Sequence, residues 1–419
     1  MNQDYYGLAT YSQRILELAS RKGYAATVKL LLKHDAVNPK QGVSLVQPLY
    51  IAAFYGHEAI VKLLLEHDAI DLNFTSTNGS SPLYAAAENG HEAVVKLLLE
   101  YGSIDPNFTT PSGSSPLYAA VYKGHEAPVK LLLKHDSIDP NPRASSSLYR
   151  FSPLGAAADN GHEAIVQLLL EHDAIDPNVT NAKGSSVLYE AAYKGHEAIA
   201  KLLLEHDSIN PNLGDIFRIS TPLHAAVDHG HEAIVRLLLE HDAINPNLGR
   251  TRGSTPLYAA AREGREGIVK LLLEHVATDP NLGIESSRKS PLSVAIENGH
   301  EACVKLLLEH DAIDLNQLDG CDQSPLFTAA KKGDEAIVKL LLSSKNFRKT
   351  ATDELFQNVL QVAAAKGNHS IVELLLSAED IWKDIVSNSA RDALIYKADD
   401  RGREVVVRTL RAQGVTHLN

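Results

Sequence analysis

Residues 161–178 read GHEAIVQLLLEHDAIDPN, and close copies of this phrase recur along almost the whole chain. Neighbouring copies are often 34 residues apart, as from Gly56 to Gly90, and the other steps stay within a few residues of that. Such a period is typical of stacked supersecondary units, each of which buries a face on its neighbours. Aligned on the first glycine, the copies begin at Gly23, Gly56, Gly90, Gly124, Gly161, Gly195, Gly230, Gly264, Gly299, Gly333, Gly367 and Gly402.

Residues 80–115 show what one unit contains. The stretch SSPLYAAAENG (80–90) predicts a short helix, because Ser81 suits an N-cap, Pro82 the first helical position and Gly90 a left-handed end. The stretch HEAVVKLLLE (91–100) predicts a second helix with a broad apolar face, which we expect to be longer and more buried. The turn-rich residues 104–115 predict a projecting finger.

This order of elements resembles the ankyrin repeat, whose signature T-P-L-H-x-A occurs as TPLHAA at residues 221–226. Other copies read SPLYAA, TPLYAA or SPLGAA, and the resemblance covers about twelve units between residues 12 and 413. It implies an all-α solenoid of stacked helix-turn-helix units with projecting β-hairpin or loop fingers, curved around a concave groove. We predict one array over residues 1–419: a capping repeat at 1–38, regular repeats at 39–344, and degenerate repeats with a C-terminal cap at 345–419. Both ends carry charges where interior copies are apolar, as expected of caps.

Composition narrows the class of protein. The chain is 44% hydrophobic and 22% charged, with two cysteines and a formal charge of −12. An acidic surface argues against general binding of nucleic acid, and no apolar stretch is long enough to span a membrane. We expect an intracellular protein, cytoplasmic or nuclear, with no cofactor or metal.

Fifteen of the nineteen histidines recur at two places, the GHE turn and the HD helix end. A residue that is repeated in every layer does not mark a site that is used once, so we interpret these histidines as scaffold. The GHE histidine is expected to bond backbone within the inter-helix turn, and the HD histidine to interact with the helix dipole. Tyrosine often replaces the family histidine of the first helix, as in Tyr84 and Tyr258, and we expect its ring between layers with the hydroxyl in solvent.

Differences between the copies indicate where a partner binds. In proteins that resemble this one, partners contact the finger tips and the exposed positions of the first helices. Here the two residues before each aligned glycine vary, and the irregular fingers 142–152 and 213–220 add aromatic and arginine residues, so we place the centre of binding between them. Gly155 replaces the usual tyrosine and is expected to widen the groove. The predicted binding residues are Tyr122, Tyr149, Arg150, Phe151, Asp159, Tyr193, Asp215, Phe217, Arg218, Asp228, His229, Arg250, Arg252 and Arg262.

Basic residues follow these positions and predict a surface for an acidic segment, phosphate or carboxylate. They are Arg250, Arg252, Arg262, Arg265, Arg288, Lys289, Lys331 and Lys332.

The predicted function is a non-catalytic scaffold that binds a segment of a protein partner in the groove. The alternative is a small-molecule-binding or catalytic groove around repeats 5–8, in which Asp159, His224, Asp228 and His229 perform acid/base chemistry. A passive structural spacer is a third hypothesis. No nucleophile elbow, phosphate loop or metal motif is present, which favours the non-catalytic interpretation.

Overall fold

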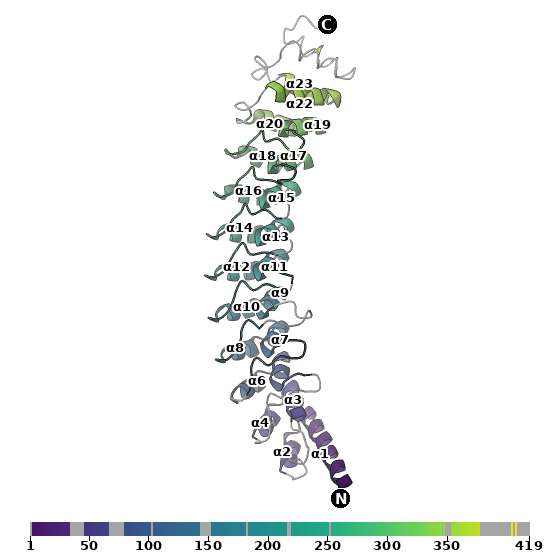
Figure 1. The fold of residues 1–419 in the computed structure, drawn as a ribbon, viewed down its shortest axis with the longest axis vertical. Coiled ribbons are helices and arrows are strands. Elements are labelled where there is room, and N and C mark those ends of the chain that lie inside the picture. Colours follow the sequence, from purple (N-terminus) through teal and green to yellow (C-terminus); the bar gives the residue numbers. More distant parts are fainter. Residues whose placement is uncertain are drawn as a thin grey trace. The chain divides into compact units, whose positions relative to one another are not determined.

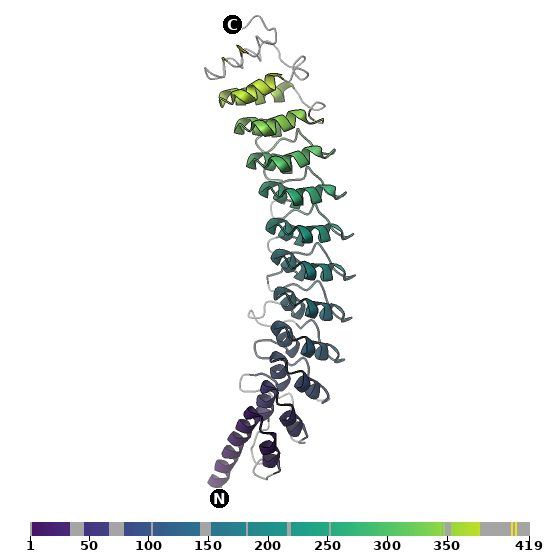
Figure 2. The ribbon, with the colours of Figure 1, turned by 180° about the vertical axis from the view of Figure 1, so that it is seen from behind.

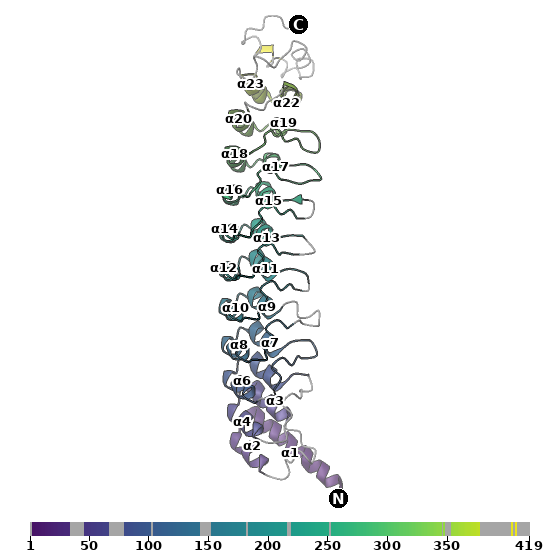
Figure 3. The same cartoon turned by 60° about the vertical axis from the view of Figure 1, so that its left-hand side comes forward.

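The computed structural model describes residues 2–33, 46–66, 79–101, 104–142, 152–181, 183–215, 219–250, 253–345 and 353–377, with residues 347, 404, 407 and 408. The chain divides into two compact units, Met1–Ile216 and Phe217–Asn419. In each unit, pairs of antiparallel helices are stacked in successive layers (Figures 1 and 2). Within a layer, the first helix lies between the second helix and the finger (Figure 3).

The described helices of the first unit alternate between first and second helices of a repeat. They are α1 (Asn2–Lys22), α2 (Ala25–Leu32), α3 (Val46–Tyr55), α4 (Glu58–Leu65), α5 (Pro82–Glu88), α6 (Glu92–Leu99), α7 (Pro116–Lys123), α8 (Glu126–Leu133), α9 (Pro153–Asp159), α10 (Glu163–Leu170), α11 (Val187–Lys194) and α12 (Glu197–Leu204).

The second unit continues the same alternation. Its described helices are α13 (Pro222–His229), α14 (Glu232–Leu239), α15 (Pro256–Glu263), α16 (Glu266–Glu274), α17 (Pro291–Asn298), α18 (Glu301–Glu309), α19 (Pro325–Lys332), α20 (Glu335–Ser343), α22 (Asp353–Ala365) and α23 (His369–Ser377). The described fingers are loops, and two of them contain an isolated β-bridge, Thr180 to Ser186 and Ile284 to Lys289.

The helix ends follow the predicted local chemistry. The Ser81 hydroxyl accepts a hydrogen bond from the backbone amide of Tyr84 (3.1 Å), and Pro82 occupies the first helical position of α5. Gly90 adopts a φ of 76°, a left-handed conformation that costs glycine little. The Ser-Pro start and the glycine end are therefore confirmed.

The burial of the two helices is the reverse of what the sequence suggested. In α5 the six residues Pro82–Ala87 are buried, whereas in α6 only Val94, Val95 and Leu98 are. The first helix is covered on both sides, because α5 packs against α3 and α7 as well as against α6. The second helix keeps its lysines and glutamates outward. The second helix of this unit is longer than the first by a single residue, with 8 residues in α6 and 7 in α5. The expectation that the second helix is the more buried of the two is wrong.

The tyrosines at the family histidine position pack inside the layers. Tyr84, Tyr118, Tyr189 and Tyr258 are only 4–9% exposed. Burial raises the pKa of the Tyr258 hydroxyl. These side chains belong to the core, with little of each ring left in contact with solvent.

One asparagine of each DPN phrase joins its repeat to the next. The Asn141 side-chain amide donates to the Ala174 carbonyl oxygen (2.7 Å), and its oxygen accepts from the Asp176 backbone amide (3.0 Å). Both bonds recur for Asn107, Asn178, Asn247 and Asn281.

The GHE histidines form a second series of bonds between layers. His91 Nε2 donates to the Phe54 carbonyl oxygen of the preceding repeat (2.9 Å), and Arg265, which replaces this histidine in its repeat, donates to the Asp228 carbonyl oxygen (2.6 Å). The predicted backbone bond therefore exists, but it crosses to the neighbouring layer. His57, His125 and His300 bond in the same way.

The HD histidines also contact backbone. His172 Nδ1 accepts a hydrogen bond from the Ala174 backbone amide (3.2 Å). The ring nitrogen thus acts as a hydrogen-bond acceptor just beyond the end of the second helix. The same bond is made by His135, His206, His241, His275 and His310.

The first repeat exposes several large apolar side chains. Tyr11, Ile15 and Leu18 on α1 are 69%, 49% and 57% exposed, as is Leu30 on α2 at 71%. Polar residues are present as well, since Thr27 stands where Ile60 is buried in the next repeat and Glu17 stands where Tyr84 is buried in a later one. Within the described residues, no helix combines the length and the apolar character that crossing a bilayer requires.

Candidate functional site

Two exposed tyrosines stand out on the first helices of the first unit. Tyr122 on α7 is 52% exposed and Tyr193 on α11 is 40% exposed. Each ring stacks on the buried tyrosine one turn earlier, Tyr118 at 6.1 Å and Tyr189 at 6.3 Å between ring centroids. The buried partners hold the exposed rings in place. We call Tyr122, Lys123, Asp159, Asn160, Tyr193 and Lys194 the tyrosine surface.

Helix α9 lies between the two tyrosine-bearing helices and packs against both. Its Asp159 forms an ion pair with Lys194 of α11 (2.5 Å), and the same ammonium group donates to the Asp159 carbonyl oxygen (3.0 Å). Lys123 lies 6.0 Å from the centroid of the Tyr122 ring. The predicted residues Tyr122, Asp159 and Tyr193 therefore lie on successive first helices of one unit.

Gly155 does not open a ligand-sized space. It is buried on α9, and the cavity beside it has a volume of about 10 Å³, closed by residues that include Ser186, Val187 and Glu190. This volume matches a single water molecule. The expected widening of the groove at this position is absent.

Several predicted residues cannot be placed. Tyr149, Arg150, Phe151, Phe217, Arg218 and Arg252 lie outside the described residues. Asp215 is described but only 7% exposed, so its side chain offers little surface to a partner.

In the second unit, Asp228 on α13 is already bound by arginine. Arg250 donates to both carboxylate oxygens of Asp228, at 2.5 and 2.8 Å. This bidentate geometry is the strongest that an arginine and a carboxylate form. Arg250 and Asp228 thus neutralise each other, and His229 is exposed beside them.

Most of the cations that follow also have acceptors. Lys289 contacts both oxygens of Glu297 (2.6 and 2.8 Å), and this hydrogen bond raises the pKa of Lys289. The other contacts join Arg262 to Glu263, Arg288 to Asp322, and Lys332 to the Glu297 carbonyl oxygen. Lys331 differs, since its amino group contacts only a neutral amide, Gln323 Oε1 at 3.4 Å, among the described partners.

The proposed acid/base group His224 is buried and fully bonded. Its Nε2 donates to the Ser254 carbonyl oxygen (2.8 Å), and its Nδ1 accepts from the Thr221 hydroxyl (2.9 Å). Desolvation is the main cause that lowers the pKa of His224 to about 4. Because the side chain is 0% exposed, no substrate reaches it. Burial also raises the pKa of the Cys303 thiol to about 11, so this thiol stays protonated.

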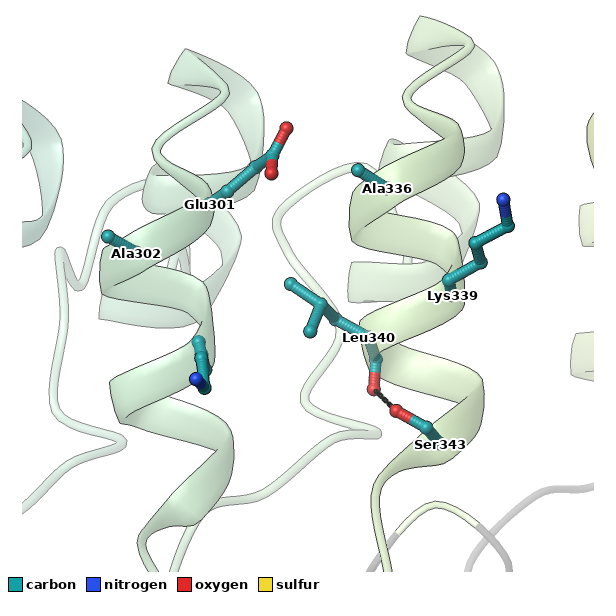
Figure 4. A pocket seen from close by; sticks show the side chains of 7 residues that line it. Glu301, Ala302, Ala336, Lys339, Leu340 and Ser343 are labelled. Atoms are coloured by element: carbon teal, nitrogen blue, oxygen red, sulfur yellow. Dashed lines mark hydrogen bonds between the residues drawn. The ribbon is translucent and has the colours of Figure 1, made fainter.

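The described residues contain no cluster of His, Cys, Asp or Glu that could hold a metal ion. A hollow of about 670 Å³ lies between α18 and α20, lined by Ala302, Ala336 and Leu340 among others (Figure 4). A hollow of about 410 Å³ between α8 and α10 is lined by the residues at matching repeat positions, such as Ala127, Ala164 and Leu168. The two hollows therefore occupy the same position of the repeat, between second helices that carry small residues.

A further pocket of about 400 Å³ lies between α22, α19 and the finger before it, residues 319–324. The sequence analysis missed this pocket. A signal was present, because the copy around Gly367 reads QNVLQVAAAKG and lacks the Ser-Pro or Thr-Pro start of most other first helices.

Solved structures that are similar to this chain contain ankyrin repeats. A search of curated proteins gave no match. Among solved structures, the human ASB11 ankyrin repeat domain is 26% identical with a TM-score of 0.42, and the match covers 50% of this chain and 90% of that one. The ankyrin repeat domain of Bcl-3 is 25% identical with a TM-score of 0.48 (54% and 97% covered), and the ankyrin repeat protein EF0377 is 28% identical with 0.43 (47% and 98%).

The family model described as ankyrin repeats in three copies matches six overlapping segments. They are residues 8–76, 49–144, 141–215, 210–284, 278–353 and 326–417. Since these matches run through nearly the whole sequence, and the described residues fold as stacked helix pairs with fingers, the chain belongs to the ankyrin repeat family.

Proposed function

We propose that this protein is a non-catalytic scaffold that binds a segment of a partner protein on the surface formed by its first helices and fingers. Ankyrin repeats generally mediate protein–protein interaction. Members of a fold family differ in what they bind, so the argument for this chain rests on its own surface.

The observation that carries the proposal is the pair of exposed, stacked tyrosines, Tyr122 and Tyr193. They occupy positions that vary between otherwise constant repeats. Tyrosine offers a large contact area with few rotatable bonds, and rings that are already held in place lose little entropy on binding. The Asp159–Lys194 pair adds a polar contact between them.

The catalytic alternative has no supporting observation. His224 has both ring nitrogens occupied, and Asp228 is bound by Arg250. The side chains of His224 and Asp228 are thus occupied by hydrogen bonds within the fold.

The test is a comparison of captured partners. The full chain and the double variant Tyr122→Ala, Tyr193→Ala are used to capture proteins from the native cell, and each captured protein is quantified. For each partner of the wild-type chain, we expect the double variant to capture an amount that is lower by about tenfold or more. The reason is that tyrosines at the centre of an interface often contribute over 1 kcal/mol each to the binding free energy.

The matched control is Tyr24→Ala, which removes a tyrosine that is 59% exposed outside the tyrosine surface. It should capture the same partners as the wild-type chain. Circular dichroism should show similar unfolding midpoints for all three proteins, because exposed side chains contribute little to stability. Equal capture by the double variant would contradict the proposed function.

A further inference from the structure

We propose that the pocket between α19, α22 and finger 319–324 binds an apolar side chain of a partner peptide that carries a carboxylate close by in its sequence. This inference rests on the proposed function and specifies the chemistry of one contact. It concerns the second unit alone and is independent of the tyrosine surface.

The lining of the pocket suits a side chain joined to a peptide backbone. Its apolar part is made by Phe327 of α19 with Val362 and Ala365 of α22. Amide side chains contribute the rest, namely Gln323, Asn358 and Gln361. At about 400 Å³ the space exceeds a single side chain and falls in the range of ligand pockets. The apolar walls suit the side chain of an apolar residue, and the amide side chains among them suit the peptide groups on either side of that residue.

The pocket is open because the repeat of α22, which follows the repeat of α19 and α20, starts differently. Phe327 occupies the position of Tyr118 and Tyr258, which are buried, yet Phe327 is only partly covered. The first helices from α5 to α19 begin after a Ser or Thr N-cap, whereas the matching residue Asn358 lies within α22, which already begins at Asp353. The helix thus brings Asn358 and Gln361 to the place where a regular repeat has its N-cap and its tyrosine.

The finger that forms one wall is fixed in advance. Arg288 of the preceding finger pairs with Asp322 (2.8 Å) and donates to the Asp319 carbonyl oxygen (3.1 Å). The Gly320 backbone amide donates to the Ser287 carbonyl oxygen (2.6 Å). The buried Asp319 carboxylate accepts from the backbone amides at 321 and 323. A wall that needs no ordering lowers the entropic cost of binding.

The positive charge of Lys331 favours a partner peptide that carries a carboxylate. In the preceding repeat, the finger residue Lys289 is neutralised by the helix residue Glu297. The matching residues here are Gln323 and Lys331, so the cation faces an uncharged amide. Among the described residues, Lys331 therefore has no carboxylate partner, and its contact with Gln323 places it at the edge of the pocket. The carboxylate of Asp322 is offset by Arg288. A carboxylate in the partner peptide, close to the apolar residue that enters the pocket, would supply the anionic partner that Lys331 lacks.

The test uses an array of short synthetic peptides in a Gly/Ser background. One position carries Leu, Phe or Ser, and a neighbouring position carries Asp, Asn or Lys. The probe is the fluorescently labelled full chain. We expect the strongest retention on peptides that combine Leu or Phe with Asp, and about tenfold weaker retention where Ser replaces the apolar residue, because burial of that side chain provides most of the affinity.

Two variants separate the pocket from the charge. Ala365→Arg occupies the pocket from an exposed helix position and should abolish the preference for Leu or Phe. Lys331→Gln should keep that preference but lose the preference for Asp over Asn. Lys305→Gln, the same change on a second helix, is the matched control and should bind like the wild-type chain.

The proposal is overturned if the wild-type chain does not discriminate among the peptides, or if both variants bind as it does. A pocket already filled by another part of this chain would give the first of these results. Because capture of native partners through Tyr122 and Tyr193 is measured separately, its persistence alongside a failed array would reject the pocket while leaving the proposed function in place.

Discussion

His224 is an ionisable side chain that is fully buried between the layers. It stands where Tyr118 and Tyr258 stand in other layers, and it is 0% exposed. Both ring nitrogens are bonded, one to the Thr221 hydroxyl and one to the Ser254 carbonyl oxygen. Desolvation disfavours the charged ring, which is why the neutral form is held in the folded state.

This environment predicts a pH-dependent stability. Burial lowers the pKa of His224 from 6.5 to about 4, so between these values the unfolded chain binds a proton that the folded chain does not. The stabilisation is fully present above pH 6.5 and is lost as the pH falls towards 4. We expect His224→Tyr, which installs the residue of other layers, to remove this dependence.

The measurement is guanidinium unfolding followed by circular dichroism at about pH 7.5 and about pH 5. Between these conditions the wild-type free energy of unfolding should fall by about 2 kcal/mol more than that of the variant. The difference between the two proteins cancels the other titrating groups. Parallel losses in both would show that His224 is not the source.

Among the described residues, all those with a positive φ that are not glycine lie in fingers. In the described fingers before α5 and the later capped first helices, the residue two before the N-cap adopts a positive φ, and glycine fills that position at Gly113, Gly184 and Gly253 among others. Three fingers use other residues there, Ile219, Arg288 and Asp322, with φ of 49°, 48° and 55°. For Arg288 and Asp322 the mutual ion pair offsets the strain, but Ile219 is 60% exposed and β-branched.

Replacement of Ile219 by glycine should therefore stabilise the second unit. The left-handed conformation destabilises the folded state by about 1–2 kcal/mol for a β-branched residue, and glycine removes this strain. Glycine also has more conformational freedom in the unfolded chain, which opposes part of the stabilisation. The net increase in the free energy of unfolding should therefore be below about 1 kcal/mol. The unfolding midpoint in guanidinium is the readout. Arg288→Gly is the matched comparison and should stabilise less, because it also removes the pair with Asp322. A lower midpoint for Ile219→Gly would contradict a strained finger.

The elements also show which features the sequence could predict. Helix starts and ends follow from Ser81, Pro82 and Gly90, because capping is decided by neighbours in sequence. The bonds of Asn141 join atoms more than thirty residues apart, and they could be foreseen only once the layers were stacked. The same holds for the pairing of Arg250 with Asp228, which turns a predicted ligand-binding cation into a neutralised one.

The predictions about the surface were likewise confirmed where the repeat register decides exposure, and were not confirmed where contacts between layers decide it. Variation between copies predicted that Tyr122 and Tyr193 would be exposed, since exposure follows from repeat register. The same register did not predict that Asp215 is buried, or that the space beside Gly155 is closed by Ser186, Val187 and Glu190. Both depend on how fingers fold against the next layer, for which no periodic signal exists.

On the scale of the whole molecule, stability is expected to be additive over neighbours. Within each unit the described helices contact their own repeat and the adjacent ones, and both hydrogen-bonded series step from one layer to the next. Such arrays behave as sums of repeat and interface free energies. A local defect should therefore weaken its own part of the chain first.

Two Leu→Ala substitutions at the same repeat position, one in each unit, test whether a defect acts locally. Leu98 in α6 and Leu272 in α16 occupy the same repeat position and are both 0% exposed. Each Leu→Ala change should cost about 2–5 kcal/mol locally, through lost burial and the cavity left behind. Native-state hydrogen exchange should then show Leu98→Ala lowering amide protection most in α5 to α8, and Leu272→Ala lowering it most in α15 to α18. If either change lowers protection equally in both units, the whole chain unfolds as one cooperative body and nearest-neighbour additivity does not describe it.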